Sequence, residues 1–180
     1  MKGIVFTEFL DMVEEKFSDD IVDTIIDASD LSTDGAYTAV GTYSHTEMLQ
    51  LVTHLAKETD IEVPALVEVF GHYLFQRFTK IYPIFFADVD NSFDFLQTVE
   101  NHIHVEVKKL YPDAELPTFE TKMLDENTLE LIYISKRPFQ KLAEGMIKEC
   151  GIYYKENIEL EVEDNSTDNG MNVRFVITKH

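Results

Sequence analysis

Hydrophobic positions recur every three or four residues through the first 110 residues, as in helices with one buried face. This spacing predicts helices over residues 3–16, 19–28, 44–58, 64–79 and 92–111. The third helix should begin at Ser44, because Glu47 follows at the distance of a capping box. Gly71 lies inside the fourth helix, where it lowers helix stability. It allows either close approach of a backbone or flat ligand, or simply a looser helix.

After Pro117 the pattern changes to short alternating runs, which predict strands. We expect strands over residues 118–123 and 128–135 around a turn at 124–127, and a second hairpin formed by 158–162 and 171–178. Between the hairpins, Pro138 should open a helix that ends near Cys150 with Gly151 as its C-cap. The expected class is therefore α+β: one domain over residues 1–180, mostly helical over 1–111, with a small antiparallel sheet in the mixed lobe 112–180.

The overall charge and the cysteine content exclude several classes of partner and site. The net charge of −19 repels nucleic acid and anionic membranes and favours a basic protein surface. The single cysteine, Cys150, allows no internal disulfide or cysteine-rich zinc site and fits a cytoplasmic protein. No signal peptide or membrane-spanning run is expected. The 13 Phe and 8 Tyr suit either an aromatic-rich core or a wide apolar cavity.

No zinc-protease, hydrolase or nucleotide-binding motif is present, so an enzyme has no support in the sequence. Two of the six histidines, His102 and His104, lie on the predicted 92–111 helix and flank its apolar stripe on opposite sides. His104 is favoured slightly as the buried one, because it shares its side with Val107 and Tyr111. A lone helical histidine is more often a partly exposed residue, or one satisfied within the core, than a ligand.

A second group of polar residues lies on the predicted strand 128–135 and just beyond it. Alternate residues of a strand share a face, so Tyr133, Ser135 and Arg137 should point the same way. Two hydroxyls and a guanidinium form a good receptor for a pair of carboxylates. An ordinary polar sheet face would show the same spacing.

Taken together, these residues resemble the H-NOX (haem–nitric oxide/oxygen binding) family, which includes the haem domain of soluble guanylate cyclase. The resemblance rests on Met1-Lys2-Gly3, on His104 followed by Tyr111-Pro112 and Pro117, and on the motif Tyr133-x-Ser135-x-Arg137. It covers essentially the whole chain, and the combined spacing of histidine, proline and strand motif is specific. His102 does not match, because its distance from Pro117 is wrong.

The resemblance implies a role for each of these residues around a b-type haem buried between the two lobes. His104 would be the proximal iron ligand, and Pro117 would press on the porphyrin and distort it. The haem propionates would be held by Tyr133, Ser135 and Arg137. The distal side would be lined by Val5, Phe9, Leu74, Phe78 and Leu142.

The resemblance also implies a ligand preference. Leu142 occupies the position where oxygen-binding relatives carry a tyrosine, and Leu74 occupies the supporting polar position. Without a donor for bound oxygen, we expect a nitric oxide sensor that also binds carbon monoxide and discriminates against oxygen. The alternatives are a general oxygen-binding gas sensor or redox sensor on the same fold, and a haem-independent interaction module.

The expected output is a shift of the His104 helix that a separate signalling protein detects. A chain of this length should carry no output domain or enzyme activity of its own. In similar stand-alone bacterial proteins, the partner is a histidine kinase or an enzyme that makes or degrades cyclic-di-GMP. The acidic surface is consistent with docking to a basic region of such a partner.

Overall fold

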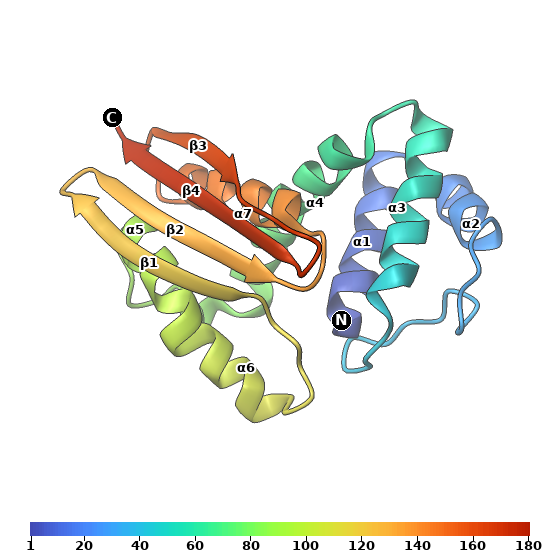
Figure 1. The fold of residues 1–180 in the computed structure, drawn as a ribbon. Coiled ribbons are helices and arrows are strands. Elements are labelled where there is room, and N and C mark those ends of the chain that lie inside the picture. Colours follow the sequence, from blue (N-terminus) through green and yellow to red (C-terminus); the bar gives the residue numbers. More distant parts are fainter.

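The computed structural model describes residues 1–180 and contains a helical lobe and a lobe built on a sheet (Figure 1). The helices are α1 (Gly3–Lys16), α2 (Asp19–Asp27), α3 (His45–Thr59), α4 (Val63–Ile81), α5 (Ser92–Thr98), α6 (His104–Leu110) and α7 (Gln140–Tyr153), with a 3-10 turn η1 (Pro83–Phe85) and a π-helical segment η2 (Val99–Ile103). The strands are β1 (Thr118–Asp125), β2 (Thr128–Ser135), β3 (Ile158–Asp164) and β4 (Met171–Lys179). The predicted α+β class is confirmed. None of the helices combines the length and the apolar character needed to cross a membrane.

The four strands form an antiparallel sheet in the order β1-β2-β4-β3, so β1 and β3 are its edges. Both predicted hairpins are present, but the first turn is tighter than expected. Leu124 and Asp125 continue β1, and Asp125 pairs with Thr128, which leaves Glu126-Asn127 as the connection. The Asn127 amide donates to the Asp125 carboxylate at 2.8 Å, a local bond that stabilises this short turn.

The buried hydrophobic side chains form two clusters, and α4 contributes to both. The first fills the space between α1, α2, α3 and the first part of α4, and includes Phe6, Phe9, Met12, Leu51, Leu55 and Leu66. The second lies between the sheet and the helices α5 and α7, and includes Phe95, Leu131, Ile147, Cys150, Phe175 and Ile177. Leu74 belongs to the first cluster and Phe75 to the second. In Figure 1, α4 accordingly runs from the helical lobe to behind the sheet.

The backbones of α4 and α7 touch where Gly71 meets Gly145. A Cβ atom on Gly145 would lie 2.1 Å from the Glu68 carbonyl oxygen, and one on Gly71 would lie 2.4 Å from the Leu142 carbonyl oxygen. Only glycine permits such an approach. Of the alternatives that the sequence left open for Gly71, the structure therefore shows the close approach of a backbone.

Two details of the predicted helix ends were wrong. Gly151 is not a C-cap but lies inside α7, which ends at Tyr153, and Lys155 (φ 58°) makes the left-handed turn instead. Ser44 caps α3 by accepting from the Thr46 amide at 3.3 Å, but Glu47 does not complete a capping box. Its carboxylate turns inward, because the hydroxyls of Ser32 and Tyr37 donate to it at 2.8 and 2.7 Å.

We expect Gly145→Ala to destabilise the fold by about 1–3 kcal/mol, because its methyl group must push apart two helix backbones. Urea denaturation followed by circular dichroism measures this. Gly151→Ala is the matched control on the same helix, since its methyl group would press mainly on the movable Ile158 side chain and approach backbone only at the Glu156 carbonyl oxygen, 3.4 Å away. Equal stability of the two variants would contradict the constraint at the crossing.

Candidate functional site

A largely apolar cavity of about 980 Å³ lies between α1, α4, α7, the α5–α6 segment and the first hairpin. Its volume is at the upper end of the range of about 300–1,000 Å³ that is typical of pockets for small molecules and cofactors. The polar side chains of its lining are few and come mainly from three places: His104, the loop that leads into β1, and the end of β2. The cavity therefore suits a large, mostly apolar ligand with a polar end.

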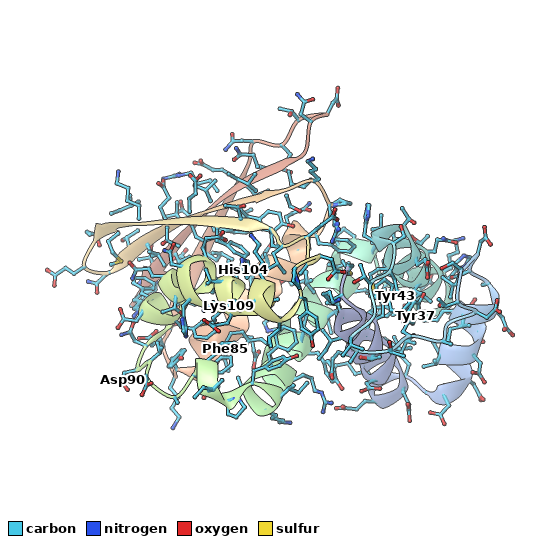
Figure 2. The ribbon with its side chains drawn as sticks, turned by 90° about the horizontal axis from the view of Figure 1, so that it is seen from below. Tyr37, Tyr43, Phe85, Asp90, His104 and Lys109 are labelled. Carbon is cyan, nitrogen blue, oxygen red and sulfur yellow. The ribbon has the colours of Figure 1, made fainter.

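His104 is the histidine that lines the cavity, and it is the first residue of α6. Its side chain is only 12% exposed, and its Nδ1 lies 3.0 Å from the Glu100 carboxylate. Burial lowers the pKa of His104 more than Glu100 raises it, so the ring is neutral near pH 7. A neutral imidazole is the form that binds metal ions. Figure 2 shows His104 at the side of its helix nearest the sheet, as expected from the 5.6 Å between its ring and that of Phe119.

His102 faces elsewhere. Its ring packs edge-on against Phe85 at 6.0 Å, and it does not line the cavity. The slight preference of the sequence for His104 as the buried residue is therefore confirmed.

The 92–111 segment is not the single α-helix that its periodicity predicts. It contains the π-helical turn η2, in which the His104 amide donates to the Val99 carbonyl oxygen five residues earlier. The wider turn changes which face the following residues present. Leu110, which belongs to the apolar stripe of an ideal helix here, is 69% exposed. A helical wheel assumes constant pitch and cannot detect such a change.

Tyr133, Ser135 and Arg137 all line the cavity, although only the first two lie in β2. The strand ends at Ser135, so the expectation that Arg137 continues the strand face was wrong. A turn brings it back instead, because the Arg137 amide donates to the Ser135 hydroxyl oxygen at 3.0 Å.

The Arg137 guanidinium binds the carboxylate of Glu115, and it also donates to the Glu115 carbonyl oxygen at 3.3 Å. Glu115 comes from the loop before β1, and its side chain is 78% exposed. Sequence reasoning missed this partner, since nothing in the loop marks one acidic residue among many. The pairing shows that Arg137 can bind a carboxylate at the rim of the cavity.

Most of the other predicted site residues also lie on the cavity wall. They are Val5 on α1, Leu74 and Phe78 on α4, Leu142 on α7, and Pro117 before β1. Phe9 is the exception and corrects the prediction. It is 1% exposed, packs against Phe70 with ring centroids 5.2 Å apart, and lies one turn deeper in the helical lobe than Val5.

Tyr82 is a cavity residue that the sequence did not indicate as functional. It follows the last residue of α4, and its ring packs against Phe78 at 5.6 Å. Burial raises the pKa of Tyr82, so its hydroxyl keeps its proton and can donate a hydrogen bond. Elsewhere on α4 and α7 the lining side chains are apolar, namely Leu74, Phe75, Phe78, Leu142, Ala143, Met146 and Ile147.

A neutral histidine and a carboxylate receptor thus lie in one apolar cavity. The family model for haem-NO-binding proteins matches residues 2–162. The chain belongs to the H-NOX family. H-NOX domains are haem-binding gas sensors, and the predicted resemblance is confirmed.

Solved H-NOX structures match this chain over its whole length. The Fe(II) unliganded H-NOX protein from K. algicida is 40% identical, with a TM-score of 0.93 over 100% of this chain and 97% of the other. The H-NOX from Shewanella woodyi, studied in the Fe(II)CO ligation state with IWP-051 bound, is 39% identical, with a TM-score of 0.85 and coverage of 100% and 95%. The T. tengcongensis protein, at 20% identity, 99% and 97% coverage and a TM-score of 0.90, shares the fold. No match was found among curated proteins.

The residues of this H-NOX cavity fit a haem group. The apolar walls suit the porphyrin, and the buried neutral imidazole of His104 offers a nitrogen ligand. The Glu115 carboxylate on Arg137 shows how an acidic group can be bound at the cavity rim. One neutral imidazole with a guanidinium at the rim is a donor set compatible with a metalloporphyrin. No group of three or more His, Cys, Asp or Glu that could hold a free metal ion was found.

Proposed function

We propose that this H-NOX protein senses nitric oxide through a b-type haem held by His104 and regulates a separate signalling protein. The observation that carries the proposal is that the neutral His104 ring and the Arg137 guanidinium share one apolar cavity. Ferrous haem supplies an iron atom that binds nitric oxide and carbon monoxide. The chain supplies the ligand nitrogen, the receptor for the propionates and the environment of the bound gas.

The residues of each cavity wall have a separate role in this proposal. His104 would hold the iron, and Arg137, with Ser135 and Tyr133, would hold the propionates through charge-assisted hydrogen bonds. Pro117, in the loop that leads into β1, would meet the porphyrin with a rigid ring that resists displacement. The distal wall is formed by Val5, Leu74, Phe78 and Leu142.

The apolar distal wall favours nitric oxide over oxygen. Leu74 and Leu142 provide no hydrogen-bond donor, and oxygen depends on such a donor more than nitric oxide does. One observation favours the alternative, an oxygen-binding sensor: the Tyr82 hydroxyl is protonated and belongs to the same cavity. The two candidate functions therefore differ in the role of Tyr82, which would donate a hydrogen bond to bound oxygen only in the oxygen-binding sensor.

The signal leaves the site through His104 and α6. A partner can respond only if it binds the two positions of this helix with different affinity. We propose a histidine kinase or a cyclic-di-GMP synthase or phosphodiesterase as the partner, docked through a basic surface because this chain carries a net charge of −19. The protein itself acts as a sensor without enzyme activity. A cytoplasmic location agrees with its single, buried, unpaired Cys150.

We expect His104→Gly to abolish stable haem binding, with at least tenfold less haem per purified chain, because even loss of a residue that supports a metal ligand costs about 10–100-fold in affinity. The Soret absorbance per chain measures this. Adding imidazole to the growth medium should restore haem, since imidazole can fill the space of the removed ring. His102→Gly is the matched control and should keep its haem. Loss of haem in the control alone would contradict the assignment of His104.

In air, the absorption spectrum of the ferrous protein should show no stable oxygen complex. Addition of nitric oxide should convert the spectrum completely to that of a nitric oxide complex. Leu142→Tyr should slow oxygen dissociation up to about tenfold, the effect of one added hydrogen bond of about 0.5–1.5 kcal/mol. A wild-type oxygen complex that is lost in Tyr82→Phe would instead establish the oxygen-binding alternative. Val69→Tyr, an added tyrosine at an exposed position of α4 outside the cavity, serves as the control.

Glu115→Gln should raise haem affinity by up to about fivefold, because an exposed ion pair of about 0.2–1 kcal/mol no longer competes with a propionate for Arg137. Transfer of haem to an acceptor protein such as apomyoglobin measures the change. Glu126→Gln removes the same charge from the exposed β1–β2 turn and should have no effect. A lower affinity in Glu115→Gln would show that Glu115 supports haem binding rather than competing with it.

A further inference from the structure

Glu100 connects the ring of His104 to the edge of the sheet. Its Oε2 atom lies 3.0 Å from His104 Nδ1, and the Phe119 amide of β1 donates to the same oxygen at 3.1 Å. The Glu100 side chain is 28% exposed and that of His104 is 12% exposed. One carboxylate oxygen therefore accepts hydrogen bonds from two elements that are far apart in the sequence.

The local backbone explains both contacts. Glu100 lies in the π-helical segment η2 and precedes His104 by four residues, so the two side chains lie one above the other. β1 is an edge strand, and on its outer side its amides have no neighbouring strand to bind. The Phe119 amide finds its acceptor in Glu100 instead. The carboxylate is thus held by the sheet and does not depend on the histidine for its position.

The contact with Glu100 determines which nitrogen of the His104 ring is free to bind a metal ion. A carboxylate can only accept, so Nδ1 of the neutral ring carries the proton and donates it to Glu100. The lone pair then lies on Nε2, the other nitrogen of a ring that lines the cavity. A carboxylate on the far nitrogen also makes the ligating nitrogen more basic.

We infer that Glu100 is the positioning residue for His104: it fixes the tautomer with the lone pair on Nε2, holds the ring plane against β1, and strengthens the bond from Nε2 to iron. The inference rests on the proposed role of His104 as the haem ligand. It adds a residue that controls the strength of this bond, and with it the ease with which His104 and α6 can be displaced.

The test compares Glu100→Gln and Glu100→Leu with the wild type in the ferrous, gas-free holoprotein. Resonance Raman spectroscopy should show the iron–histidine stretching band at lower frequency in Glu100→Gln and lower still in Glu100→Leu. Haem should dissociate about tenfold faster from Glu100→Leu, the lower end of the effect of losing a partner of a metal ligand. Glu106→Gln is the control, because Glu106 lies on α6 with His104 but pairs with Lys109 at 2.6 Å.

A second measurement needs no haem. In the haem-free full chain, the nitrogen NMR shifts of His104 should report the tautomer protonated at Nδ1 in the wild type and in Glu106→Gln. Glu100→Leu should shift the population toward the tautomer protonated at Nε2. This readout separates orientation of the ring from a general loss of stability, which circular dichroism would reveal.

The outcomes distinguish the inference from the function on which it rests. A wild-type holoprotein without an iron–histidine band would refute His104 as the ligand and therefore the proposed function. A normal wild-type band that stays unchanged in both Glu100 variants would overturn the positioning role alone. An unchanged tautomer in Glu100→Leu would overturn it as well.

Discussion

The apolar cavity between the two lobes is the constraint on which the rest of the structure depends. An unfilled apolar space costs about 24 cal/mol per Å³ in protein cores. Even half of the 980 Å³ at this rate would cost roughly 12 kcal/mol, comparable with the whole free energy of unfolding of a typical domain. A large ligand that fills this space would therefore stabilise the fold, which agrees with the haem binding of the H-NOX family.

The elements around the cavity hold its walls apart and close its ends. The glycine contact between α4 and α7 joins the lobes through backbones, so no side chain at the crossing needs to enter the cavity. The sheet supports the other end. There β1 fixes Glu100, and β2 delivers Tyr133 and Ser135. Under the proposed function, rigid elements on both sides would allow a small movement of His104 to reach a distant surface instead of being absorbed locally.

Helices and strands were predictable because their apolar periodicity extends over many residues, and the histidine-to-proline and strand motifs are local. The predictions that failed concern features that depend on tertiary contacts. Glu47 has the spacing of a capping box, yet buried hydroxyls from Ser32 and Tyr37 draw it inward. The π-helical turn at η2 rotates the face of α6, and no periodic pattern records a change of pitch. Likewise Glu100, Glu115 and Tyr82 acquire their importance only from neighbours that the fold brings to them.

The pair formed by Arg137 and Glu115 has a consequence for the chain before it binds a cofactor. A partly buried guanidinium without a counterion would destabilise the haem-free fold. Glu115 is the counterion that the chain itself provides. If Arg137 holds a haem propionate as proposed, cofactor binding would exchange one carboxylate for another and free the Glu115 loop next to Pro117. The exposed Glu115 side chain would then report at the protein surface whether the cavity is filled.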